Sequence, residues 1–215
     1  MRAVIYQDKN PTLAQQRDLA EKALLLPLIG VRRHDVVLDA GCGSGRWAEV
    51  LIPACGRYFG VDASRGLVDI ARQRFGQCHN ARFDVASVDR LSDSIVLAAE
   101  RFTRLISFGV YIYLNDADVE SALQQLCSVA APEAKVVLRE PVATGDRLTL
   151  TDFYSEDMDQ AYSAVYRPES ELMEMFERTL GAAGFRLHGR GDVFEAGLNN
   201  RAETRQRWFV WSRVR

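Results

Sequence analysis

The fold of this chain is decided by the stretch Val36-Val37-Leu38-Asp39-Ala40-Gly41-Cys42-Gly43-Ser44-Gly45. Its first residues form an apolar run that ends on an acid, which is typical of a buried parallel strand. The three glycines allow a sharp turn and a close approach of a ligand to the backbone. A helical pattern follows from Arg46, and a helix N-terminus offers free N–H groups to an anion. We therefore predict a strand–loop–helix unit that holds the anionic end of a ligand.

The residues around the glycines argue against a dinucleotide. A dinucleotide fingerprint needs a small residue at the position of Arg46, where helix and strand pack closely. Asp39 would repel a diphosphate, whereas its carboxylate can accept a hydrogen bond from an ammonium group. A nicotinamide-dependent dehydrogenase is therefore the disfavoured alternative.

Two further acids follow apolar strands. Asp62 closes the strand 57–61 and suits a ribose diol, and Asp84 ends the strand 81–83, where it can accept from the amine of adenine. An ammonium group, a ribose and an adenine without a diphosphate describe S-adenosylmethionine. We expect Ala63, Val85 and Ser107, which lie at strand ends, to line the same site.

With these residues the chain resembles the class I S-adenosylmethionine-dependent methyltransferases of the small-molecule type. The stretch 37–45 looks like their first motif, Asp62 like their ribose acid and Asp84 like their adenine-side acid, and the resemblance runs from about Asp35 to the C-terminus. It implies S-adenosylmethionine as the cofactor, with Gly41, Gly43 and Gly45 around its methionine part.

Alternating strands and helices predict an α/β fold. We expect a Rossmann-like, seven-stranded, mostly parallel sheet with helices on both faces and an antiparallel last strand. We expect residues 1–215 to form one domain, with an N-terminal helical cap at 1–30 and a lid insertion at 141–167 that holds a short helix near 156–166. The expected strands are 36–39, 57–61, 81–83, 104–107, 134–138, 185–188 and 206–212, and the expected helices are 11–29, 46–52, 64–75, 93–100, 116–129 and 168–183.

Methyl transfer from a sulfonium is an in-line displacement that needs positioning more than an activated residue. The segment 107–114 should lie below the methyl group. It lacks the Asn/Asp-Pro-Pro-aromatic sequence of enzymes that methylate DNA bases, and no Pro-Cys nucleophile is present, which disfavours nucleic acid as a substrate. Alternation places one of Tyr111 and Tyr113 at the site, and we expect this to be Tyr111.

The acceptor side is predicted from the end of the fifth strand and the lid. Glu140, fixed by the following proline, is the expected catalytic acid or base, with an ion pair to a nearby arginine as the alternative. Arg167 is expected to bind a substrate carboxylate, and Tyr162 and Tyr166 to wall the pocket or simply to pack on the sheet. This layout loosely resembles the amine-directed α-N-terminal protein methyltransferases, which favours an amine nucleophile.

Two other features have open interpretations. Tyr6 and Arg17, near and in the first helix, are placed to reach the methionine carboxylate, with a surface position as the alternative for Arg17. Residues 152–177 contain eight acids and one base. They form either a solvated face or a lid that attracts a cationic substrate.

The composition of the chain argues against several other classes of protein. The 215 residues are 47% hydrophobic without a run long enough to span a membrane, and the net charge of −2 gives no reason to expect nucleic acid. The four cysteines show no metal-like spacing and read as reduced thiols, so we expect a cytoplasmic protein without a metal. A homodimer is compatible with these features.

The sequence therefore predicts a methyltransferase for a small metabolite or short peptide, with an amine nucleophile favoured over a hydroxyl. Two alternatives remain: S-adenosylmethionine is itself the substrate of a cyclisation or other non-methyl reaction, or the chain is a non-catalytic partner subunit.

Overall fold

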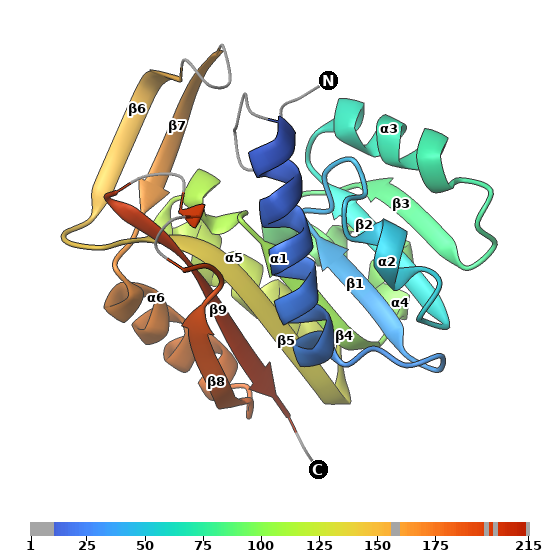
Figure 1. Ribbon diagram of the computed structural model, residues 1–215. Helices are drawn as coiled ribbons and strands as arrows, with labels where there is room; N and C mark the ends of the chain where they lie inside the picture. The colour runs from blue at the N-terminus through green and yellow to red at the C-terminus, as the bar shows by residue number, and fades with distance from the viewer. Residues whose placement is uncertain (1–10, 156–159, 196–197, 200–201, 214–215) are drawn as a thin grey trace.

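A seven-stranded sheet forms the centre of the protein, in the order β3-β2-β1-β4-β5-β9-β8 (Figure 1). The structure is a computed structural model that describes residues 11–155, 160–195, 198–199 and 202–213. The strands of this sheet are β1 (Val36–Ala40), β2 (Arg57–Asp62), β3 (Ala81–Val85), β4 (Phe102–Phe108), β5 (Ala130–Ala143), β8 (Arg186–Asp192) and β9 (Thr204–Ser212).

Strands β1 to β5 are parallel, and β9 runs antiparallel to both β5 and β8. The predicted fold class, including the antiparallel last strand, is confirmed. The strand order reverses between β1 and β4, and the carboxyl ends of the parallel strands meet at one edge. Ligands of open parallel sheets bind beyond that edge at such a reversal.

Helices cover both faces of the sheet, as predicted. They are α1 (Pro11–Ile29), α2 (Ala48–Leu51), α3 (Arg65–Phe75), α4 (Ile95–Ala99), α5 (Asp116–Val129) and α6 (Glu169–Phe176), with the short turns η1 (Val88–Asp93), η2 (Tyr111–Tyr113) and η3 (Glu177–Gly181). In Figure 1, α1 lies across the front of the sheet and α5 behind it.

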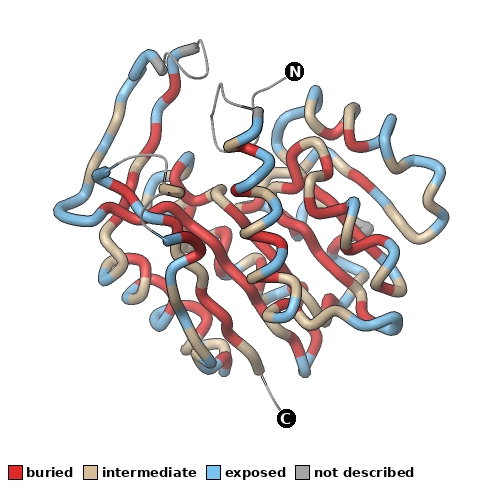
Figure 2. The backbone as a smooth tube through the Cα atoms, viewed as in Figure 1, coloured by how far each residue is buried: buried red, intermediate tan, exposed pale blue. Residues whose placement is uncertain are grey.

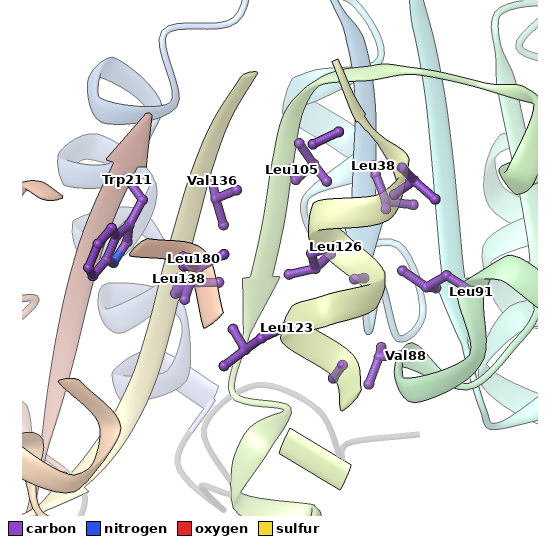
Figure 3. Close-up of a cluster of buried hydrophobic side chains, with 14 of the residues drawn as sticks. Leu38, Val88, Leu91, Leu105, Leu123, Leu126, Val136, Leu138, Leu180 and Trp211 are labelled. Carbon is purple, nitrogen blue, oxygen red and sulfur yellow. The ribbon is translucent and has the colours of Figure 1, made fainter. Parts of the chain in front are cut away.

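Alternating side chains of each strand build two cores. Val37 faces the core under α1, whereas its neighbour Leu38 faces the core under α5, because successive strand residues point to opposite faces. Trp211 lies in the α5-side core, as expected from its apolar surroundings in the sequence (Figure 3). Figure 2 shows the central strands buried along their length.

Local signals at helix starts are partly confirmed. Ser64 caps α3 by accepting a hydrogen bond from Leu67 N at 3.4 Å. Asn115 caps α5: it takes the extended backbone conformation of a cap and accepts from Asp118 N at 2.9 Å.

The insertion 141–167 differs from the prediction. It contains no described helix; β5 continues to Ala143, and a hairpin of β6 (Leu148–Ser155) and β7 (Gln160–Tyr166) follows. The prediction of a short helix was wrong because burial alternates along the segment: Tyr162 and Ala164 are buried, with Ser163 exposed between them. Residues 156–159 lie outside the described part of the chain. The hairpin projects at the end of the sheet where the N-terminus of α1 lies (Figure 1).

Within the described residues, the helices are too short or too polar to cross a membrane.

Candidate functional site

The glycine loop after β1 is drawn tightly against its neighbours. Gly41 N and Cys42 N both donate to Val61 O at 2.8 Å. Gly41 and Gly45 have φ angles of 87° and 81°, in the left-handed region that favours glycine. A Cβ on Gly41 would overlap the Val110 side chain, and one on Gly45 would lie 2.8 Å from the Phe75 ring. Both the backbone conformation and the packing of Val110 and Phe75 therefore require glycine at these two positions.

Asp62 joins this loop to the end of β2. Its Oδ2 accepts from Gly43 N at 3.0 Å and its Oδ1 from Ser64 N at 2.8 Å. These two bonds fix the orientation of the carboxylate, and each oxygen retains a second lone pair for a diol. The carboxylate is therefore pre-oriented at the carboxyl edge, as predicted from the sequence.

Asp39 lies beneath the loop and is buried. Burial raises its pKa to about 7, and the Asp62 carboxylate adds to this increase, whereas the hydrogen bond from Tyr58 and the nearby Arg46 oppose it. A cation that binds here would favour the ionised form. The site is therefore suited to the ammonium group expected from the sequence.

A cavity of about 370 Å³ lies just beyond the ends of β2 and β3, and its lining begins with Ala63, the residue after Asp62. Ala63 and Val85 line it as expected, and that they contact a cofactor remains a prediction. The complete lining is Ala63, Val85, Ala86, Ser87, Arg90, Asp93 and Ser94.

Asp84 does not line this cavity. Its carboxylate accepts from Arg82 Nε at 3.2 Å and lies 3.5 Å from Arg72 Nη2. That Asp84 contacts the adenine of a cofactor remains a prediction. Strand β3 extends two residues further than expected, which moves its end to Val85 and brings Ser87 to the cavity. The sequence did not indicate Ser87, because the length of β3 depends on its pairing with β2.

One of the two tyrosines after β4 is buried in the core and the other is exposed, as predicted, but the exposed one is Tyr113 and not Tyr111. Tyr111 is 1% exposed and packs against Phe176, with ring centroids 6.4 Å apart, whereas Tyr113 is 55% exposed. The expectation that Tyr111 faces the ligand is therefore wrong, because its ring completes the α5-side core. Ser107 is also buried, and its hydroxyl has no partner among the described residues.

Glu140 is buried at the site where a catalytic carboxylate was expected. Its Oε1 accepts from Val110 N at 2.9 Å and from Tyr111 N at 3.2 Å. Burial raises its pKa to about 7. Its Oε2 has no hydrogen-bond partner within the described chain. The alternative of a direct ion pair with an arginine is not observed among these residues; instead, the carboxylate holds the main chain that follows β4.

The residues predicted to contact a substrate from the lid pack within the protein or form hydrogen bonds to other parts of the chain. Tyr162 and Tyr166 are buried with Ile112, and their hydroxyl oxygens are 3.3 Å apart. Arg167 is buried and donates to Asp116 and to two main-chain carbonyls. It does not present its guanidinium to a substrate carboxylate, contrary to the prediction.

Comparison with known proteins supports the fold and the cofactor side of the site. Residues 37–133 match the family model described as a methyltransferase domain. Malonyl-[acyl-carrier protein] O-methyltransferase of Serratia marcescens is 26% identical over 159 residues, which are 74% of this chain and 58% of that protein. Nodulation protein S of Bradyrhizobium diazoefficiens is 27% identical over 101 residues, or 46% of each chain. The chain thus spans about half the length of these relatives.

Solved structures show the same fold at low identity. The magnesium protoporphyrin IX methyltransferase of Synechocystis with bound S-adenosylmethionine has a TM-score of 0.66 and 17% identity, over 99% of this chain and 89% of that one. Phosphoethanolamine N-methyltransferase 1 of Haemonchus contortus, in complex with phosphoethanolamine and S-adenosylhomocysteine, has a TM-score of 0.76 and 15% identity, over 100% of this chain and 46% of that one.

Residues 37–133 therefore resemble a methyltransferase domain, and the chain has the fold of structures that bind S-adenosylmethionine.

Helix α1 is anchored on the site by buried charges that the sequence did not reveal. Glu21 accepts from Arg139 Nε at 2.8 Å and from Arg46 Nη1 at 2.7 Å, so it joins α1 to β5 and to the end of the glycine loop. Arg17 donates to Leu198 O at 2.7 Å and is buried, so neither the expected ligand contact nor the surface alternative is observed. Tyr6 lies outside the described residues.

The acids in the segment 152–177 are partly neutralised. Glu169 lies within 3.5 Å of the guanidinium nitrogens of Arg190, Arg205 and Arg207, and Glu171 pairs with Arg147 at 2.6 Å. Glu169 therefore links α6 to β8 and β9, and Glu171 links α6 to the residue before β6. The acids at 156–159 lie outside the described residues.

Proposed function

We propose that this protein binds S-adenosylmethionine at the carboxyl edge of its sheet and transfers the methyl group to a small molecule. The observation that carries this proposal is the Asp62 carboxylate, held by Gly43 N and Ser64 N beside the cavity lined by Ala63. Asp39 suits the ammonium group, and the glycine loop accommodates the methionine part. When bound, the cofactor supplies a methyl group activated by a positive sulfur.

The acceptor of the proposed reaction is an amine on a small metabolite or short peptide. An alcohol must lose a proton as it attacks, whereas a neutral amine already presents a lone pair. The three histidines do not lie at the carboxyl edge: His34 and His79 precede β1 and β3, and His188 lies within β8. Glu140 Oε1 is occupied by two main-chain N–H groups, and its Oε2 is buried and has no hydrogen-bond partner within the described chain. The histidine placements and the burial of Glu140 favour a nucleophile that needs no base.

The names of the related proteins cover both chemistries. The Haemonchus structure is an N-methyltransferase and the Serratia relative is an O-methyltransferase. The preference for nitrogen therefore rests on the residues of this chain alone.

The reaction is tested by incubating the protein with methyl-labelled S-adenosylmethionine and fractionated metabolites of its host. We expect S-adenosylhomocysteine together with a labelled product whose fragmentation places the methyl group on nitrogen. A label on oxygen or carbon would refute the amine acceptor alone. Methylthioadenosine in place of S-adenosylhomocysteine would indicate that the cofactor is the substrate, and binding without turnover would indicate a non-catalytic subunit.

The cofactor site is tested independently by calorimetry with S-adenosylhomocysteine. Asp62→Ala should weaken binding by about 2–3 kcal/mol, because a charge-assisted pair of bonds to the ribose is lost. Asp69→Ala is the matched control, since Asp69 is an exposed acid of α3 that pairs with Arg72, and it should leave the affinity unchanged. Equal affinities for both variants would refute the assignment of Asp62.

A further inference from the structure

Arg167 joins four separate segments at the acceptor side of the site. It follows β7, is 1% exposed and donates from Nη1 to Tyr111 O at 2.9 Å and from Nη2 to Leu114 O at 2.7 Å. Its Nε donates to Asp116 Oδ1 at 2.8 Å, and its own carbonyl accepts from Ala143 N at 3.0 Å. The hairpin base, the end of β5, the segment after β4 and the start of α5 therefore meet at one side chain.

Residues of β5 also hold the N-terminal part of the segment 109–114. Glu140 Oε1 accepts from Val110 N and Tyr111 N, and Gly109 N donates to Arg139 O at 2.7 Å. The buried Glu140 side chain accepts from N–H groups of this segment, and the buried Arg167 guanidinium donates to its carbonyls. Such bonds to charged groups are stronger than those between neutral groups, so the segment has little freedom to shift.

The position of this segment matters because it contacts the cofactor loop. The side chain of Val110 occupies the space where a Cβ of Gly41 would lie. A shift of 109–114 would therefore change the relation between the methionine part of the cofactor and the acceptor side. Displacements of about 1 Å between reacting groups reduce rates by about 100-fold.

We propose that Arg167 is a positioning residue, which locks the segment 109–114 between the β6–β7 hairpin and the glycine loop for methyl transfer. This inference deepens the proposed function and rests on it. The planar guanidinium makes three bonds in fixed directions, which the single ammonium of a lysine does not reproduce. The role therefore requires arginine and not only a positive charge.

Arg147 provides a matched control for Arg167. Both arginines bind Asp116, but Arg147 is 37% exposed and makes its other bonds to Glu171. Arg147→Lys removes surface ion pairs and leaves 109–114 untouched, whereas Arg167→Lys removes the bonds to Tyr111 O and Leu114 O.

The experiment compares these two variants with the wild type by hydrogen exchange of peptides covering 109–114, by calorimetry with S-adenosylhomocysteine, and by turnover of labelled cofactor in host extract. We expect Arg167→Lys to exchange about tenfold faster in 109–114, the change expected for losing a hydrogen bond to a charged group. Its turnover should fall about 100-fold, while its affinity for S-adenosylhomocysteine stays within a factor of about three. Arg147→Lys should match the wild type in all three measurements.

Exchange and turnover of Arg167→Lys equal to those of Arg147→Lys would overturn the inference. If Arg167→Lys does not fold, Asp116→Asn replaces it, because it weakens the contacts of Asp116 Oδ1 with Nε and Nη2 of Arg167 as well as the bond to Arg147, for which Arg147→Lys is the control. Exchange in 109–114 equal to that of Arg147→Lys would then count against the inference. A wild type that forms no S-adenosylhomocysteine would refute the proposed function, while the exchange data would still decide whether Arg167 locks the segment.

Discussion

Tyr58 donates a hydrogen bond to Asp39 Oδ2 across 2.5 Å, from β2 to the neighbouring parallel strand β1. The strand register places Gly60 directly opposite Asp39 and Tyr58 opposite Val37. The Phe83 ring and Cys42 Sγ fill the space where a side chain of Gly60 would lie. Tyr58 and Asp39 are both buried, so the bond between them controls how readily Asp39 ionises.

Replacing Tyr58 with Phe should make cofactor binding more sensitive to acid. The hydrogen bond from Tyr58 lowers the pKa of Asp39, which burial has raised to about 7, so the variant should raise that pKa further. Since the ionised carboxylate favours an ammonium ligand, affinity should fall as the pH decreases through about 7, and the midpoint should lie at higher pH in the variant. A shift of one pH unit in the midpoint corresponds to about tenfold weaker binding on the acid side of the midpoint.

Calorimetry with S-adenosylhomocysteine at pH 6, 7 and 8 measures this shift, with the exposed Tyr154→Phe as control. Superimposable pH profiles for wild type and Tyr58→Phe would argue against the link.

Replacing Gly41 with Ala should abolish cofactor binding for two separable reasons. The new Cβ overlaps Val110, and the backbone φ of 87° is strained for alanine by roughly 1–2 kcal/mol. The double variant Gly41→Ala with Val110→Ala removes the overlap but not the strain, so it should recover part of the affinity. Gly66→Ala is the control, since nothing lies within 4 Å of a Cβ there. Full recovery in the double variant would show that backbone conformation at Gly41 is unimportant.

Relative to wild type, the Glu140→Gln variant should be more stable at alkaline pH than at acid pH. The folded-state pKa of Glu140 is raised from 4.5 to about 7, so the wild type binds this proton more tightly when folded and loses stability as the pH rises from about 4.5 to 7. Glutamine does not ionise and still accepts hydrogen bonds. The free energy of unfolding of the variant, relative to wild type, should therefore increase between pH 5 and pH 8 by up to about 3 kcal/mol. Urea unfolding at both pH values measures it, with Glu174→Gln as an exposed control. A difference independent of pH would mean that Glu140 ionises normally.

Replacing Glu169 with Gln should destabilise the protein in a salt-dependent way. Its carboxylate is the shared partner of Arg190, Arg205 and Arg207 and is only 15% exposed. Loss of the charge leaves a partly buried cationic cluster, which should cost about 1–3 kcal/mol of unfolding free energy. Glu174→Gln on the same helix should change it by less than about 0.5 kcal/mol. Urea unfolding in 0.1 M and 1 M salt tests this, and the loss should shrink in high salt because the remaining repulsion is screened. Equal stability of the two variants would show that the cluster does not stabilise the fold.

Much of the fold was predictable because its signals are local. The glycines, the apolar strands and the cap at Ser64 each act within a few residues of the chain. The alternation of strands and helices then leaves few topologies, and the observed strand order is among them. The segment 156–166 was mispredicted because its period of two becomes visible only when one face of the hairpin is buried against η2.

The residues of the candidate site likewise fall into two groups, those indicated by local sequence and those set by tertiary packing. The sequence by itself determined the glycine loop and the acids Asp39 and Asp62, since each ends a strand whose direction and position follow from the local pattern. Only the tertiary structure decided the roles of Tyr111 and Arg167, whose side chains could equally have faced a ligand. Arg167 binds a carbonyl 56 residues away, and Arg139 binds a carboxylate 118 residues away. Buried polar groups take whichever partners the packed chain brings near, and no local pattern specifies contacts over such separations.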